Sequence, residues 1–129
     1  MVRRSAVADD GIEFTVRAHQ VEGNLWIAEQ GNLSPNGNKI GRMTPTGVIT
    51  EFAVPTPNAS PTWINAHSDG TLWFTEVSGN KIGRITTNGA FLEFPIPTPS
   101  SSPIAIASGA DGNLWFTEAA GNKIGRIVP

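Results

Sequence analysis

Short segments of β-forming residues alternate along the chain with clusters of Gly, Asn, Ser and Asp. Such clusters favour tight turns, and in the middle of the chain they occupy residues 68–70, 78–80 and 87–89. The strands predicted between these turns lie near 62–67, 72–76, 81–86 and 90–95. Because no helical period competes with this pattern, we predict an all-β chain built from four-stranded antiparallel meanders.

The same pattern returns 42 residues later. Residues 58–87 and 100–129 align without gaps and share 17 identities in 30 positions. An earlier copy has its tryptophan, Trp26, 47 residues before Trp73, which places five extra residues in the loop 30–37. The chain of 129 residues, 1–129, therefore reads as a single domain with units at roughly 11–57, 58–99 and 100–129.

A unit of about 42 residues with four strands has the size of one blade of a β-propeller, whose sheet buries both faces against neighbouring blades. Closed propellers have about 4–8 blades. Three blades leave apolar faces at both ends, so we expect the ring to be completed by oligomerisation, with a homodimer giving six blades. The third blade lacks a predicted fourth strand after residues 123–127.

Residues 11–16 echo the outer-strand pattern of residues 47–52 and 89–94. One interpretation is that they complete a third blade across a subunit boundary. However, Phe14 lies only 12 residues before Trp26, which leaves no room for a separate inner strand in the first unit. Residues 11–16 could instead be that inner strand, and the sequence leaves both interpretations open.

The hairpin between the second and third strands of the middle unit predicts specific cross-strand pairs. A regular turn around 77–80 pairs Glu76 with Lys81, Phe74 with Gly83 and Trp73 with Arg84. These pairs predict an ion pair, an aromatic ring over a glycine and a guanidinium stacked on an indole, each worth roughly 0.2–1 kcal/mol. We therefore expect these residues to be structural.

Composition narrows the classes of function. The formal net charge of −2 lacks the basic excess that phosphate contacts require, so we expect no nucleic-acid partner. The absence of cysteine excludes disulfides and thiolate metal sites. No apolar run approaches the roughly 20 residues of a membrane span. Residues 1–10 contain no apolar segment of a signal peptide, so we expect a cytoplasmic protein with no membrane partner.

The most specific motifs are Gly-Asn-Leu-Trp-Phe-Thr-Glu at 112–118 and Gly-Asn-Lys-Ile-Gly-Arg-Ile at 121–127, both repeated earlier in the chain. Over roughly residues 23–129 this wording resembles the streptogramin B (virginiamycin B) lyase family. The resemblance implies a seven-bladed propeller that opens the ester link of a cyclic depsipeptide antibiotic by Mg²⁺-assisted elimination. It also implies that a histidine is the base and that nearby glutamates hold the metal.

In that family the catalytic histidine follows a proline at the start of an inner strand. The matching positions here follow Pro61 and Pro103, and they hold Thr62 and Ile104. Neither side chain can take a proton from carbon near neutral pH. At the two positions that match the family's histidine, this chain therefore lacks a base.

The two histidines of the chain are the remaining candidates for a catalytic base. His67 ends the first predicted strand of the middle unit, five residues beyond Thr62, and His19 lies in the irregular segment 17–20. For both residues, an exposed surface position is the simpler interpretation.

Three glutamates recur at one blade position, and each is matched by a lysine. The glutamates are Glu29, Glu76 and Glu118, and the lysines are Lys39, Lys81 and Lys123. The carboxylates could converge at one mouth of a channel and bind Mg²⁺ or Ca²⁺, which prefer oxygen ligands. Because the lysines recur in step, we favour ion pairs across the strands over a metal site.

The inner strands of a propeller line its central channel. The counterpart of Trp63 in the third unit is Ala105, so the repeat does not demand an indole there. Trp63 could contact a small-molecule or peptide ligand, with Thr62 and Asn65 as its polar neighbours, and Ile104 is a further channel candidate. The alternative is that it fills space between blades or between subunits.

The sequence favours a self-assembling propeller module, for binding or structural support, that lacks the family's catalytic histidine and is not an enzyme. One alternative is a Mg²⁺-dependent lyase that forms in the assembled ring, with His67 or His19 as its base. The other is a purely structural propeller fragment without a ligand. The residues themselves predict no cofactor, and Mg²⁺ enters only through the resemblance.

Overall fold

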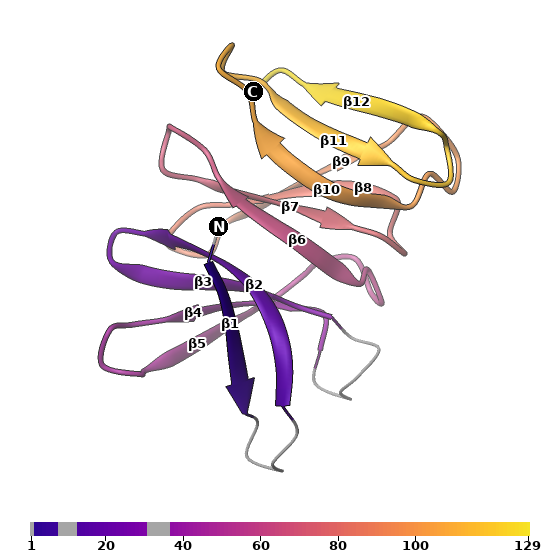
Figure 1. The fold of residues 1–129 in the computed structure, drawn as a ribbon. Coiled ribbons are helices and arrows are strands. Elements are labelled where there is room, and N and C mark those ends of the chain that lie inside the picture. Colours follow the sequence, from indigo (N-terminus) through magenta and orange to yellow (C-terminus); the bar gives the residue numbers. More distant parts are fainter. Residues whose placement is uncertain (1, 8–12, 31–36) are drawn as a thin grey trace.

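The described part of the chain comprises residues 2–7, 13–30 and 37–129, and it is all β in this computed structural model. Its strands form three antiparallel sheets that follow one another in chain order (Figure 1). The predicted all-β, propeller-type architecture is confirmed. The described residues contain no helix of the length and apolarity that a membrane span requires.

Each sheet is one blade, with its strands in chain order. The first blade comprises β1 (Val2–Val7), β2 (Glu13–Val21), β3 (Asn24–Glu29), β4 (Lys39–Met43) and β5 (Ile49–Ala53). The second comprises β6 (Pro61–Ala66), β7 (Leu72–Glu76), β8 (Lys81–Ile85) and β9 (Phe91–Pro95). The third comprises β10 (Pro103–Ser108), β11 (Leu114–Glu118) and β12 (Lys123–Ile127).

The inner strands of the blades are β2, β6 and β10, which contact one another from blade to blade. Residues 13–16 belong to β2, so the interpretation that they close a third blade as an outer strand is wrong for this structure; Gly11 and Ile12 lie outside the described residues. The 12 residues from Phe14 to Trp26 are enough for an inner strand because Glu22 and Gly23, both at positive φ, make a two-residue turn from β2 into β3. Strand β1, which the pattern did not predict, pairs with the other edge of β2.

The predicted hairpin register of the second blade is confirmed. Strands β7 and β8 pair Glu76 with Lys81, Phe74 with Gly83 and Trp73 with Arg84. The Arg84 guanidinium lies 5.8 Å from the Trp73 ring centroid. A Cβ at Gly83 would overlap the Phe74 ring, so this position requires glycine. The five-residue insertion expected in the first hairpin falls largely on residues 31–36, which lie outside the described residues.

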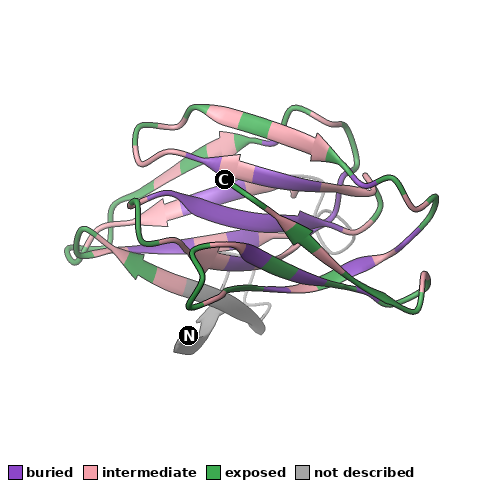
Figure 2. Ribbon diagram, turned by 90° about the horizontal axis from the view of Figure 1, so that it is seen from above, coloured by how far each residue is buried: buried purple, intermediate pink, exposed green. Residues whose placement is uncertain are grey.

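Two apolar clusters join the blades, one at each blade-to-blade boundary. The first cluster includes Trp26 and Ile40 from the first blade with Leu72 and Phe74 from the second. The second includes Trp73 and Ile82 from the second blade with Leu114 and Phe116 from the third. Buried residues therefore lie mainly in the strands, where one blade packs against the next, whereas the turns are mostly exposed (Figure 2).

Asparagine side chains fasten each blade to the segment that leads to the next one. The Asn80 amide donates to the carbonyl of Thr98 (3.0 Å), and its Oδ1 accepts from the Ser101 N–H (2.9 Å). Asn38 does the same for Thr56 and Ala59, at 3.0 and 2.8 Å. Both asparagines adopt positive φ, which this residue tolerates well. These clasps set where the next inner strand begins.

Candidate functional site

The start of the inner strands is where the family resemblance would place a catalytic base. Thr62 Oγ1 donates to the carbonyl of Ser60 (2.9 Å) and accepts from the Gln30 side-chain amide (2.8 Å). The Ile104 side chain is exposed at the corresponding place in the third blade. This end of the strands therefore offers a hydroxyl held by two hydrogen bonds and an aliphatic side chain.

A threonine that the sequence reasoning missed joins the inner strands here. The pairing of β6 with β7 is irregular between Pro61 and Ile64, which flank Trp63. Thr75 Oγ1 accepts from the Trp63 N–H (3.1 Å) and donates to the Ile104 carbonyl of the third blade (2.9 Å). The fourth position of the recurring Leu-Trp-Phe-Thr-Glu motif is thus a bridge between blades, which its recurrence could have signalled.

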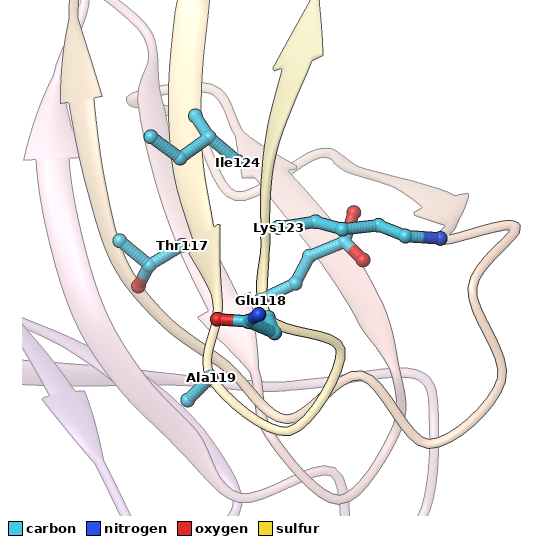
Figure 3. Close-up of a pocket in the computed structure, with 6 residues that line it drawn as sticks. Thr117, Glu118, Ala119, Lys123 and Ile124 are labelled. Atoms are coloured by element: carbon cyan, nitrogen blue, oxygen red, sulfur yellow. The ribbon is translucent and has the colours of Figure 1, made fainter.

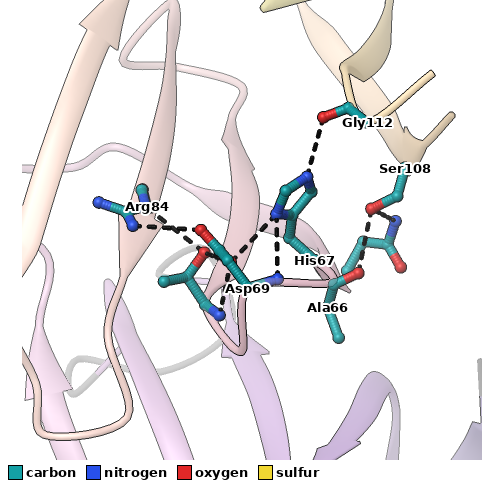
Figure 4. Close-up of polar contacts among 8 residues, drawn as sticks. Ala66, His67, Asp69, Arg84, Ser108 and Gly112 are labelled. Carbon is teal, nitrogen blue, oxygen red and sulfur yellow. Dashed lines mark hydrogen bonds and ion pairs between the residues drawn. The ribbon is translucent and has the colours of Figure 1, made fainter. Parts of the chain in front are cut away.

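His67 directly follows β6, at the opposite end of this strand from Thr62. Figure 4 shows its ring between Asp69 and Gly112. Its Nε2 is 2.9 Å from the Gly112 carbonyl of the third blade, and its Nδ1 is 3.1 Å from Asp69 Oδ1. Only 9% of its side chain is exposed. The expectation of an exposed turn histidine is therefore wrong, because the turn of the third blade packs against the ring.

Asp69 anchors this end of the second blade. Its carboxylate accepts hydrogen bonds from the Thr71 N–H (2.9 Å) and hydroxyl (2.6 Å), and it lies 3.3 Å from Arg84. Partial burial disfavours its charged form, but the hydrogen bonds from Thr71 outweigh this and lower the pKa of Asp69. His67 is thus held between an ionised carboxylate and a carbonyl, an arrangement that links two blades.

The remaining candidates are spread over the inner strands. His19 is half-buried in β2 opposite Trp26, and burial lowers its pKa. Asn65 occupies the matching place in β6 and donates to Ser108 of β10 at 3.5 Å. Trp63 is partly buried and packs against the apolar cluster between the second and third blades. Neither histidine stands beside the proline-flanked strand starts.

The predicted ion pairs between the recurring glutamates and lysines are wrong, although the cross-strand register is right. Lys81 contacts Glu93 of β9 at 3.3 Å and Thr56 at 2.7 Å. Glu76 is fully buried, and neither of its oxygens receives a hydrogen bond from the residues that the structure describes. In the first blade Lys39 likewise binds Glu51, at 2.7 Å. The outer-strand carboxylates reach the lysines in place of the recurring ones.

Burial leaves two of the recurring glutamates poor metal ligands. Burial, reinforced by the neighbouring Glu93 carboxylate, raises the pKa of Glu76 to about 8. Burial and Glu51 raise the pKa of Glu29 to about 7. The described residues contain no group of three or more His, Asp or Glu side chains placed to hold an ion. Since Mg²⁺ needs converging, ionised oxygens, these blades do not by themselves fit the metal that the resemblance implies.

Comparison with known proteins places this geometry in context. The model of the virginiamycin B lyase family matches residues 2–129. The crystal structure of virginiamycin B lyase from Staphylococcus aureus is 41% identical, with a TM-score of 0.79 over 98% of this chain and 45% of that chain. A streptogramin B lyase structure is 40% identical, with a TM-score of 0.76 over 98% of this chain and 44% of that one.

A third structure adds a ligand. It is a catalytically inactive histidine-to-alanine variant of the Staphylococcus aureus lyase with quinupristin, 43% identical, with a TM-score of 0.76 over 98% of this chain and 45% of that chain. A search of curated proteins gives no match. The chain spans less than half the length of these solved relatives. With nearly every residue included in the family match, this chain belongs to the virginiamycin B lyase family.

Proposed function

We propose that this chain supplies blades to a β-propeller that is completed by a second copy, and that the ring is a binding or structural module without lyase activity. The observation that carries this proposal is the chemistry at the start of the inner strands. Thr62 and Ile104 stand where the family would place its base. A ring made of identical chains repeats these two residues and adds no histidine at the matching positions.

The elimination requires a group that removes a proton from carbon near neutral pH. The Thr62 hydroxyl is already committed to Ser60 and Gln30, and an alcohol is far too weak a base. Ile104 has no ionisable group. The residues at these positions can therefore contact a ligand but cannot start the reaction.

The histidines do not replace the missing base. His67 lies five positions beyond Thr62, a distance of about 16 Å for extended backbone at roughly 3.3 Å per residue. His67 is also engaged at both ring nitrogens. His19 faces Trp26 in the matching part of β2, well beyond the strand start.

The second candidate function is a Mg²⁺-dependent lyase in the assembled ring. It is supported by the 41% identity to the Staphylococcus aureus lyase over 98% of this chain. The structure of a relative with quinupristin makes this compound the natural probe for both candidates.

The deciding experiment incubates the purified chain with quinupristin, with and without Mg²⁺. Opening a ring by internal elimination leaves the elemental composition unchanged, so the reaction is followed by chromatographic retention and fragmentation rather than by total mass. We expect no opening above the protein-free control. Mg²⁺-dependent opening that is lost in His67→Ala or in His19→Ala would replace our proposal with the lyase and name its base.

Calorimetric titration with quinupristin separates the two roles within the proposal. Saturable binding by an oligomer that does not open the compound supports a binding module. An intact oligomer without heat of binding to this probe favours a structural role.

A further inference from the structure

A polar pair links the first two blades at the start of the inner strands. The Gln30 side-chain amide donates to Thr62 Oγ1 at 2.8 Å, and Thr62 Oγ1 donates to the Ser60 carbonyl at 2.9 Å. Gln30 directly follows β3 and is exposed, whereas Thr62 is half-buried. Within the described part of the chain, the Gln30 side chain makes this hydrogen bond alone. Its Oε1 and its second amide hydrogen can therefore contact another molecule.

Both members of the pair depart from the repeat. The position after the recurring glutamate holds Gln30, Val77 and Ala119 in the three blades, and Figure 3 shows Ala119 at the turn that follows β11. The position after the inner-strand proline holds Thr62 and Ile104. The first boundary between blades thus has an amide and a hydroxyl where the second has two aliphatic side chains. A purely structural role would favour the same residue types at both boundaries, so the difference indicates a specific contact.

The pair also helps to join the first two blades. At the second boundary, Thr75 Oγ1 bridges the Trp63 N–H and the Ile104 carbonyl. Ala28 occupies the place of Thr75 in the first blade, so the first boundary lacks the hydroxyl of this bridge. The amide–hydroxyl pair supplies a link there, but its exposed groups exchange a bond with water for a bond with each other, which adds little stability. Joining the blades does not account for an exposed amide.

An aliphatic side chain lies at the start of the next inner strand. The Trp63 N–H and the Ile104 carbonyl both lie within 3.1 Å of Thr75 Oγ1, so β6 and β10 begin side by side. The Ile104 side chain is exposed, whereas Ile106, two residues further along β10, is buried. The starts of the inner strands thus present an amide and a hydroxyl next to an apolar side chain, and none of these three groups is charged.

We infer that the Gln30 amide and the Thr62 hydroxyl form a subsite for a peptide bond of a bound ligand, and that Ile104 contacts an apolar side chain of the same ligand. A side-chain amide presents the acceptor and the donor that match the N–H and the C=O of a peptide. An uncharged site beside an aliphatic side chain suits a neutral peptide or depsipeptide better than a phosphate or a sugar acid. This inference rests on the binding role in the proposed function and is independent of how the ring is completed.

The test is an NMR titration with quinupristin in the absence of Mg²⁺, followed on the side-chain amides of the two glutamines of the chain, Gln20 and Gln30. The Gln30 signals of the wild-type chain should shift saturably. Gln30→Met and Thr62→Val remove the hydrogen-bonding groups at similar size, and each should raise the dissociation constant about threefold to tenfold. Ile104→Ala should raise it about threefold or more, because it removes apolar contact.

Two further variants control for damage to the fold. Gln20 is exposed near the other end of the β2–β3 hairpin, so Gln20→Met should bind as tightly as the wild-type chain. Thr62→Ser keeps the hydroxyl and should keep the affinity that Thr62→Val loses. Circular dichroism and urea midpoints show that each variant is folded when its affinity is measured.

The outcomes separate this inference from the proposed function. Saturable binding with unchanged affinity in Gln30→Met and Thr62→Val would overturn the subsite and leave the binding role in place. Equal weakening by Gln20→Met, or by Thr62→Ser and Thr62→Val alike, would also overturn the subsite, because the loss would then not follow the amide or the hydroxyl. A wild-type chain without saturable binding would overturn the subsite and the binding role together.

Discussion

Strands β7 and β11 have the same sequence, Leu-Trp-Phe-Thr-Glu, and different surroundings. All five residues of β7 are buried, whereas in β11 the second and fourth residues, Trp115 and Thr117, are exposed. The difference arises because β7 has a blade on each side and β11 has a described blade on one side only. The burial of this motif therefore depends on the neighbouring blades and not on the local sequence. Its residues are apolar enough on both faces of the sheet to pack against a blade on each side.

The largest expected effect is on the tryptophans. Replacing Trp73 by alanine should lower the free energy of unfolding by about 3–5 kcal/mol, because it removes a fully buried ring. The same change at Trp115, which is 39% exposed, should cost about 1–2 kcal/mol, because less of the ring is buried. Urea unfolding measures both. Equal losses at the two tryptophans would show that local packing, and not the neighbouring blade, determines the contribution.

The buried glutamate makes stability depend on pH. The folded chain holds the Glu76 proton up to its raised pKa of about 8, whereas the unfolded chain releases it near the ordinary value of 4.5. Between these values the folded state binds more protons, so stability should fall as pH rises, by at most about 1.4 kcal/mol per pH unit. Glu29, with its pKa raised to about 7, adds to this fall at the lower end of the window.

Urea midpoints from pH 5 to pH 9 test this assignment. Glu76→Gln should flatten the profile and stabilise the chain at the alkaline end, because an amide needs no proton to remain neutral. Glu118→Gln is the matched variant in the third blade, where the described residues contain no outer strand beyond β12 to supply a counterpart of Glu93. If Glu76→Gln keeps the wild-type slope, another group carries the pH dependence.

The threonine bridge should give a smaller difference. Thr75→Val leaves the Trp63 N–H and the Ile104 carbonyl without the hydroxyl that joins them, at a cost of about 1–2 kcal/mol. Thr117 is exposed and accepts from the Ala105 N–H alone among the described contacts, so Thr117→Val should cost less than about 0.5 kcal/mol. Thermal unfolding of the two variants compares them directly, and a larger loss at Thr117 would contradict this account.

The smallest effect concerns His67. Removing its ring in His67→Ala deletes the link to the Gly112 carbonyl and should cost about 1 kcal/mol or less. The loss should appear as faster amide hydrogen exchange in β10 relative to β7. Unchanged exchange in the third blade would show that the link does not hold the two blades together.

The sequence predicted what depends on turn length and recurrence. A short turn fixed the register of Trp73, Phe74 and Glu76 against the next strand, and the structure confirms those pairs. It did not predict that Lys81 would bind Glu93, because that choice depends on packing between an outer strand and the preceding connection. Residues 13–16 misled for a related reason: they carry an outer-strand pattern, but they belong to the inner strand β2 and pair with β1.

The burial of His67 could not be predicted from the sequence either. His67 precedes a turn, where exposure is the usual outcome, and its burial comes from Gly112, 45 residues away. The clasps of Asn38 and Asn80 had a visible signal, the recurring Gly-Asn or Asn at the start of a strand, but their acceptors lie in loops whose path the sequence does not give.

The asparagine clasps also bear on how such a chain folds and grows. Each clasp joins residues only 16 to 21 positions apart, so fastening one blade to the next closes a short loop with a small entropic cost. Folding can therefore begin at any hairpin and spread along the chain one blade at a time, as in other repeat proteins. Inserting or deleting a stretch of about 42 codons that begins at such a clasp would add or remove a whole blade. The contacts between the blades on either side would be preserved.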